Sequence, residues 1–350
     1  MIDIKSPGRI CFFGDHQDYL GLPVISGTID RYVYIKASKI ESSFFEINLL
    51  DFNESLKIEF KNDPKKIAPS DYFRAGLYVL EKNGIIPNQG YQIQINGDLP
   101  INAGLSSSSS LVVGWIKFLV KAFAVGRKID NLQIAKWAVE TEVDFFNQAG
   151  GIMDQYTISI GGLMMIDTSK KTYEKLEGSL GPLLVIDSGE SKNTQGVLSN
   201  AKVNAQEAIK HVKKSNKDFD LTKSKKSDFK KYLNEIPIKY RSYWESTILN
   251  HEITKNAIKI LTRVNSSKSK LGELMNSHQY LLKNNIKNTP IKLSKQMDEA
   301  ISAGAIGAKI VGSGGGGCMV VMVDEKNISK VKKAILSSGA KDVFKVNITN

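Results

Sequence analysis

PINAGLSSSSS, at residues 100–110, is the most informative segment of this 350-residue chain. Its glycine lets the backbone approach a ligand closely, and its serine hydroxyls offer donors and a hard oxygen ligand for Mg²⁺. Apolar residues recur at helical spacing over 107–123, so the serines lie at the start of a predicted helix, where free N–H groups and the helix dipole attract anions. No Gly-Lys-Ser/Thr follows, so this is not a Walker A loop. The segment predicts a phosphate-binding loop, although a serine-rich loop with a helix N-cap fits it as well.

A second glycine-rich segment, VGSGGGGC at residues 311–318, separates two apolar runs that predict strands. Five of its six residues from 312 to 317 are glycine, which costs much chain entropy on folding. Such a loop indicates close backbone packing against another group, with a flexible turn as the alternative. No histidine or pair of basic residues lies near Cys318 in the sequence, so we expect a small buried side chain rather than a nucleophile.

Two further segments carry polar residues next to apolar ones. In SPGRICFFGDHQDY, residues 6–19, an apolar strand ends at a glycine and is followed by Asp15, His16 and Asp18. These side chains can bind several hydroxyl groups, but a metal site or a solvated turn would use the same residues. In GGIMDQ, residues 150–155, Asp154 stands between a predicted helix and an apolar segment, a position also typical of an N-cap.

Composition narrows the class of protein. The hydrophobic fraction of 41% and charged fraction of 24% are those of a globular chain, not of a disordered or coiled-coil one. Two cysteines are too few for a disulfide scaffold or a cysteine zinc cluster. We find neither an apolar run of membrane-spanning length nor a secretory signal, and expect a cytoplasmic protein without a membrane partner. The net charge of +12 comes mostly from dispersed lysines, so we expect no nucleic-acid partner.

The pattern of apolar residues predicts strands first and helices later. Alternation and apolar runs predict strands over residues 9–14, 32–39, 44–52, 55–60, 91–96, 163–166, 183–187, 309–311, 318–323 and 343–348. Helical spacing and caps predict helices over residues 71–82, 107–123, 131–146, 195–213, 240–263, 270–284, 291–303 and 327–337. A charged segment near residues 170–185 separates two apolar strands and predicts a boundary between two domains.

Taken together, PGR, GLSSSS and GSGGGGC, in this order and spacing, resemble the three motifs of the GHMP kinase family, whose members include galactokinase, homoserine kinase and mevalonate kinase. The resemblance covers nearly the whole chain. GDHQDY at residues 14–19 and GIMDQ at residues 151–155 are closer to galactokinase than to mevalonate kinase.

The resemblance implies a two-domain α+β fold. Residues 1–180 would form an ATP-binding, catalytic domain like the second domain of ribosomal protein S5. Residues 181–350 would form a ferredoxin-like domain, with the active site in the cleft between the two. The implied activity is an ATP- and Mg²⁺-dependent kinase that phosphorylates the anomeric hydroxyl of a monosaccharide, as a monomer or a homodimer.

The resemblance also implies roles for individual residues. Asp154 matches the catalytic Asp, and Arg9 matches the active-site Arg that keeps it ionised. Mg²⁺ would be held by Ser108 and Glu142. The remaining assignments are the phosphate-binding residues Gly104, Leu105, Ser106, Ser107, Ser108, Ser109 and Ser110; the sugar-binding residues Asp15, His16, Asp18, Gly151 and Asp154; and the supporting glycine loop Gly312, Ser313, Gly314 and Gly315.

The chain departs from the galactokinase pattern at several positions. Asp15 stands where galactokinases usually carry Glu, Ser109 where Ala is usual, and Gly315 where an aromatic residue is usual. The segment after the strand at 183–187 lacks a recognisable tyrosine. These departures concern the sugar more than the phosphoryl transfer. Two alternatives remain: a kinase with another acceptor, such as mevalonate or a uronic acid, and a sensor that binds ATP and sugar without turnover.

Overall fold

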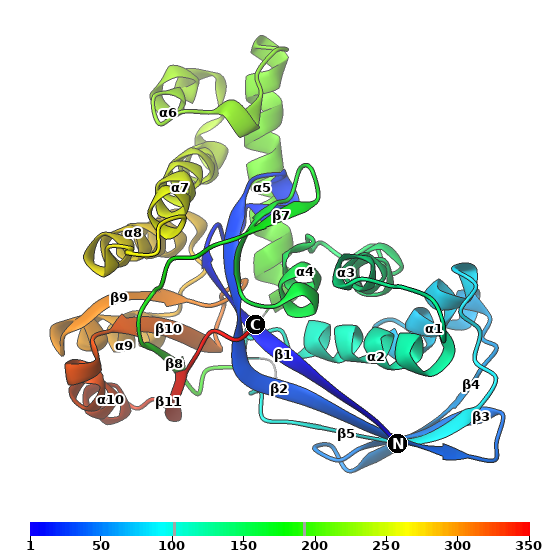
Figure 1. Cartoon of the computed structure of the whole chain (residues 1–350). Helices are drawn as coiled ribbons and strands as arrows, with labels where there is room; N and C mark the ends of the chain where they lie inside the picture. Colours follow the sequence, from blue (N-terminus) through cyan, green and yellow to red (C-terminus); the bar gives the residue numbers. More distant parts are fainter. Residues whose placement is uncertain (101–102, 192–193) are drawn as a thin grey trace.

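Two β-sheets and the helices around them make up the protein, as the computed structural model shows (Figure 1). The structure describes residues 1–100, 103–191 and 194–350. One sheet has seven strands and uses residues between 2 and 175, and the other has four strands and uses residues between 183 and 346. The predicted boundary near residue 180 falls in the connection between the two sheets.

The seven-stranded sheet is built around one long strand, β2, which pairs with β1, β5 and β6. Four helices lie on one face of this sheet, and α2 packs directly on β1 and β2 (Figure 1). The strands are β1 Ile2–Phe13, β2 Val24–Ile40, β3 Phe44–Leu49, β4 Glu54–Glu59, β5 Gly90–Gly97, β6 Leu163–Asp167 and β7 Thr172–Lys175. The helices are α1 Tyr72–Lys82, α2 Ser107–Phe123, α3 Asn131–Val139 and α4 Met153–Ile160.

The four-stranded sheet is antiparallel in the order β11-β8-β10-β9, which is the ferredoxin-like arrangement expected from the sequence. Side chains of β10 alternate between its two faces: Met319 and Val321 pack toward α9 and α10, whereas Val320 and Met322 join the core shared with the other sheet. The strands are β8 Leu183–Asp187, β9 Ala305–Ile310, β10 Cys318–Val323 and β11 Asp342–Val346. The helices are α5 Thr194–Ser215, α6 Asp228–Lys231, α7 Ile238–Leu261, α8 Lys268–Leu281, α9 Ile291–Ser302 and α10 Ile328–Ser337.

The observed elements differ from the predicted ones in a few places. Strand β7 and helices α4 and α6 were not predicted, because each is short and carries a weak periodic pattern. The helix expected over residues 131–146 ends at Val139 and continues as a π-helical turn, Glu140–Asp144. Backbone hydrogen bonds five residues apart define this turn, as from the Phe145 N–H to the Glu140 carbonyl at 2.9 Å. Single π turns of this kind occur frequently at functional sites.

Helix α6, the end of α5 and the start of α7 form an arm that projects away from both sheets (Figure 1). Its core contains Phe219, which packs against Tyr232 and Trp244 at ring-centroid distances of 5.3 and 5.7 Å. Within the part of the chain that the structure describes, we find no helix with the length and apolar character needed to cross a bilayer.

Candidate active site

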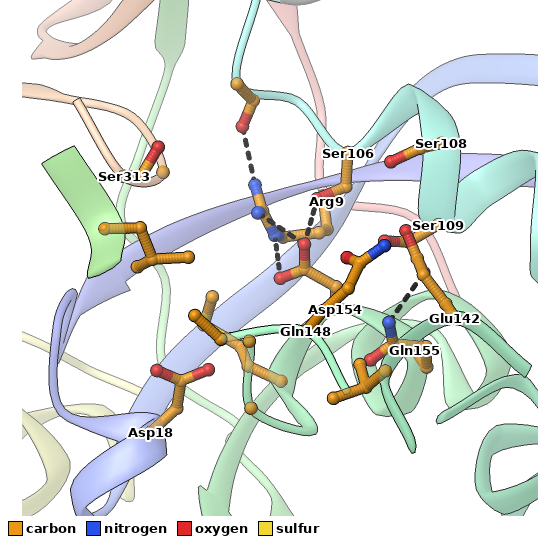
Figure 2. Close-up of a pocket in the computed structure, with 18 of the residues that line it drawn as sticks. Arg9, Asp18, Ser106, Ser108, Ser109, Glu142, Gln148, Asp154, Gln155 and Ser313 are labelled. Carbon is orange, nitrogen blue, oxygen red and sulfur yellow. Dashed lines mark hydrogen bonds and ion pairs between the residues drawn. The ribbon is translucent and has the colours of Figure 1, made fainter. Parts of the chain in front are cut away.

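A cavity of roughly 640 Å³ opens between the two sheets, and the segments singled out in the sequence meet around it (Figure 2). Strand β1 supplies Arg9, the start of α2 supplies serines, and the π turn supplies Glu142. Helix α4 supplies Asp154, and the glycine loop supplies Ser313 from the other side of the cavity. Residues far apart in the sequence therefore line one pocket.

Arg9 and Asp154 form a bidentate ion pair at the centre of the site. Arg9 Nε and Nη2 donate to the two carboxylate oxygens of Asp154 at 2.7 and 2.8 Å, and Nη1 donates to the Gly104 carbonyl at 2.7 Å. Burial would lower the pKa of Arg9, but the adjacent Asp154 carboxylate more than offsets this and raises it. Asp154 lies in the first turn of α4 and Ile152 is the N-cap, so Asp154 is not the capping residue.

The phosphate-binding loop touches Asp154 through a residue with an unusual backbone. Ser106 precedes the first turn of α2 with φ 60° and ψ 46°, in the left-handed region that non-glycine residues rarely adopt. Its hydroxyl donates to Asp154 and caps no backbone N–H of the helix. The sequence predicted Ser106 as a phosphate ligand and did not predict this contact with Asp154.

Not every residue of the predicted loop faces the cavity. Gly104 and the four serines from 106 to 109 line it. Leu105 is fully buried and its carbonyl accepts from the Arg9 backbone N–H at 3.1 Å. Ser110 is also fully buried, and its hydroxyl donates to the Ser6 carbonyl at 2.8 Å. Leu105 and Ser110 therefore hold the loop in place from behind.

Glu142 lies beside the start of α2, held by the π turn. Gln155 Nε2 donates to its carboxylate at 2.6 Å, as Figure 2 shows. Burial raises the pKa of Glu142 to about 7, although hydrogen bonds from Ser109, Gln155 and Ser108 act in the opposite direction. A buried carboxylate beside serine hydroxyls is an oxygen donor set that suits Mg²⁺, which usually takes only one or two protein ligands beside phosphate oxygens. The residues present fit this ion.

Asp18 and Gly151 line the cavity next to Asp154. Burial, followed by the nearby charge of Asp154, raises the pKa of Asp18 to about 6. The backbone of Gly151 passes so close to Asp18 that a Cβ at this position would collide with the carboxylate. A larger residue at position 151 would therefore displace the Asp18 side chain.

Asp15 and His16 line the cavity, and both also contact residues of the C-terminal domain. The Asp15 side chain is only 1% exposed, and its carboxylate pairs with Lys309 Nζ at 2.8 Å. His16 Nδ1 meets the Tyr19 hydroxyl at 2.9 Å, and Nε2 meets the Ser313 carbonyl at 3.0 Å. Sequence reasoning missed Lys309, because it lies within an apolar strand rather than in one of the motifs.

The glycine loop supports the site through close backbone packing. Gly312 and Ser313 line the cavity, whereas Gly314 and Gly315 pack against Asn288, whose carbonyl accepts from the Gly315 N–H at 2.6 Å. Further along, the loop contacts the backbone of Ala103, just before the phosphate-binding loop. The loop is therefore a packed connection and not a flexible turn.

The cavity has an apolar and amide-lined rim that the sequence did not reveal. These residues belong to no recognisable sequence motif. They come together only because of how the helices around the cavity pack. They are Tyr72, Phe146, Asn147, Gln148, Leu198 and Ser199. Gln148 Nε2 donates to the Tyr72 hydroxyl at 3.1 Å and links two sides of this rim.

Comparison with known proteins shows the same arrangement of segments. The family models for the GHMP kinases N terminal domain and the GHMP kinases C terminal match residues 71–162 and 258–341. A galactokinase galactose-binding signature matches residues 4–39. Together the matched segments span more than half of the chain.

The chain belongs to the GHMP kinase family.

The relatives of this GHMP kinase extend over its whole length. It is 28% identical over 344 residues to the galactokinase of Pyrococcus furiosus, covering 96% of this chain and 92% of that one. It is 29% identical over 345 residues to a galactokinase of Clostridium perfringens, covering 94% and 87%. These relatives and the sugar-binding signature show a sugar kinase, and GHMP kinases use ATP as the phosphate donor.

Solved structures confirm the predicted two-domain fold of this GHMP kinase. Lactococcus lactis galactokinase complexed with galactose matches with a TM-score of 0.88 at 23% identity, covering 99% of this chain and 93% of that one. Methanococcus jannaschii mevalonate kinase matches with a TM-score of 0.74 at 23% identity, covering 100% and 98%.

Proposed function

We propose that this protein transfers the γ-phosphoryl group of ATP to the anomeric hydroxyl of galactose or a closely related monosaccharide. The observation that carries the proposal is the Arg9–Asp154 pair, which lies between the phosphate-binding loop and the sugar-facing residues Asp18 and Gly151. The galactose-binding signature over residues 4–39 and the galactokinase relatives favour this sugar class over mevalonate.

Phosphoryl transfer depends mainly on positioning and on stabilising charge, and the residues of the cavity suit both tasks. Asp154 orients the sugar hydroxyl and accepts its proton while the new P–O bond forms and the bond to ADP breaks. Arg9 favours the charged form of Asp154 and stabilises negative charge on the transferred group. Ser106 supports the Asp154 carboxylate, and the N–H groups at the start of α2 bind phosphate oxygens.

Glu142 and Ser108 would hold Mg²⁺. The ion, when bound, neutralises charge on the phosphate oxygens of ATP. A sensor without turnover would not need the Arg9–Asp154 pair in the cavity, so this pair favours an enzyme.

A panel of acceptors in an ADP-release assay tests this function. Galactose, N-acetylgalactosamine, arabinose, galacturonate and mevalonate are offered with ATP and Mg²⁺, and phosphorus NMR identifies the phosphorylated position. We expect turnover on galactose or a related reducing sugar, with the phosphate on the anomeric oxygen. Asp154→Asn serves as the control for background ADP release. Turnover confined to mevalonate, or a phosphate on another hydroxyl, would contradict the proposal.

A further inference from the structure

Lys309 is a fully buried lysine in β9 that makes two hydrogen bonds and one ion pair. Its Nζ donates to the Cys11 carbonyl at 3.0 Å and to the Ile310 carbonyl at 2.7 Å, and contacts the Asp15 carboxylate at 2.8 Å. The exposed fraction of its side chain is 0%. An ammonium group is costly to bury unless it is paired and hydrogen-bonded, and here both conditions are met. The pair joins the end of β1 in one domain to β9 in the other.

The partner carboxylate, Asp15, is charged in this environment. Burial raises its pKa, but Lys309, together with smaller contributions from His278 and His16, lowers it below its ordinary value. His278 lies in the same buried region, and burial lowers its own pKa to about 3, so it is neutral near pH 7. Arg9, the Cys11 thiol and Asp18 are further titratable groups near this carboxylate. Lys309 is therefore its main countercharge.

His16 fastens the same segment to the second domain at another point. Its Nε2 lies 3.0 Å from the Ser313 carbonyl and 3.2 Å from Asn288 Nδ2, and Asn288 also donates to Ser313 at 3.2 Å. His16 has φ 62°, so its backbone adopts the uncommon left-handed conformation at this contact. Two neighbouring contacts therefore hold the segment from Gly14 to Asp18. Lys309 pairs with Asp15. Asn288 and Ser313 contact His16.

We propose that Lys309 and Asn288 are positioning residues for sugar binding, and that Asp15 acts through Lys309 rather than by touching the sugar. The ion pair and the His16 contacts hold residues 14–18 against the C-terminal domain, which places Asp18 beside Gly151 and Asp154. This inference rests on the proposed function, since it assigns these residues a part in binding the same sugar. It also replaces the direct sugar contact that the sequence predicted for Asp15.

Kinetics of a small set of variants tests the positioning. Lys309→Met leaves a buried carboxylate unpaired, so we expect the KM for the sugar to rise roughly tenfold to a hundredfold, in line with the cost of misplacing binding groups. The KM for ATP should change less than about threefold, because the start of α2 does not contact this pair. Asp15→Asn combined with Lys309→Met should recover part of the loss, since no unpaired charge remains. Lys117→Met, which removes a half-buried lysine of α2 outside the cavity, is the matched control.

Hydrogen exchange separates this inference from the proposed function. Amides of residues 12–20 should exchange faster in Lys309→Met and in the milder variant Asn288→Ala than in the wild type, while amides of α2 stay unchanged. Unchanged exchange in residues 12–20 in both variants, or an equal rise in both KM values, would overturn the positioning role. A wild type that phosphorylates no sugar would contradict the proposed function, and the exchange result would still decide whether Lys309 positions this segment.

Discussion

Arg9 and Ser106 donate hydrogen bonds to the Asp154 carboxylate. Asp154 is not the N-cap residue of α4. Asp154→Asn keeps the shape of the side chain and removes its charge. We expect kcat to fall by about 10²-fold or more, the usual contribution of a positioned acid–base group, with little change in the dissociation constant of the sugar. Steady-state kinetics and calorimetric sugar binding measure the two effects. A variant that retains more than half of its turnover would show that the carboxylate has no part in the chemistry.

We expect the folded protein to be less stable at neutral pH with Asp18 than with an asparagine at this position. Its pKa is about 6 in the folded state and about 3.9 in an unfolded chain, so folding is penalised once the group ionises. The penalty is complete above pH 6 and absent below pH 4. Since Asp18 is only half-buried, we expect Asp18→Asn to stabilise the protein by about 1–2 kcal/mol at pH 8.

Urea unfolding at pH 8 and pH 5 measures this effect of Asp18→Asn. The gain in stability should shrink as the pH falls from 6 toward 4, while affinity for the sugar is reduced at both values. Asp3→Asn, a change at an exposed aspartate of β1, is the control. An equal gain at both pH values would show that the ionisation of Asp18 is not the cause.

Glu142 should matter for the metal dependence of nucleotide binding. Glu142→Gln keeps the size of the side chain but replaces its carboxylate by an amide. An amide is a poorer ligand for a hard cation. We expect ATP binding to respond less to added Mg²⁺ in the variant. Titrating Mg²⁺ while following ATP affinity measures this. An unchanged titration would mean that the role of Glu142 is limited to packing against Gln155.

The glycine loop and the phosphate-binding loop meet backbone to backbone. The Cys318 N–H donates to the Ala103 carbonyl at 2.7 Å, and a Cβ on Gly317 would lie 2.7 Å from the same oxygen. Gly317 also has φ +79°, a conformation that favours glycine. The sequence predicted a supporting role for this loop, and its contact with Ala103 gives that role a physical basis.

Gly317→Ala should therefore push the two loops apart. We expect the KM for ATP to rise by roughly an order of magnitude, because the phosphate-binding N–H groups are misplaced. Gly339→Ala is a matched control, since Gly339 has a similar φ of +85° but no atom within 4 Å of a Cβ. Both variants bear the same backbone strain, and only the first has the collision. Equal KM values for ATP in the two variants would argue against the loop contact.

At the scale of the whole molecule, the two sheets share one hydrophobic core. Val185 and Val320 of the small sheet belong to the same buried cluster as Ile35 and Trp115 of the other domain. The end of the chain returns to the first domain, where Ile348 pairs with Ile29 of β2. The two domains therefore share a packed core, and the chain connects them at more than one point.

This shared core predicts a single unfolding transition. Because this buried cluster contains residues of both sheets, unfolding one domain would expose apolar surface of the other, and we expect calorimetry to show one cooperative peak. The calorimetric and van't Hoff enthalpies should agree. Two resolved transitions, one of which shifts with ATP alone, would show that the domains unfold independently.

Local patterns were sufficient to predict much of this protein. Helix α2 over 107–123 and strand β10 over 318–323 match their predicted bounds, because a long apolar period or run leaves little choice of structure. The two loops with unusual glycine or serine content were recognisable, and comparison confirmed the family that the motifs resemble. The π turn after Val139 was not predictable, since its sequence continues a helical pattern.

The partners and charges of the site residues depend on contacts that no local pattern encodes. Arg9 and Asp154 are 145 residues apart, and Asp15 finds Lys309 at the other end of the chain. A carboxylate in the sequence can bind sugar, bind metal or form an ion pair, and only burial and the nearest charge select among these. The motifs therefore identified the chemistry, whereas packing between the two domains determined that Asp15 pairs with Lys309 and that Asp18 faces the cavity.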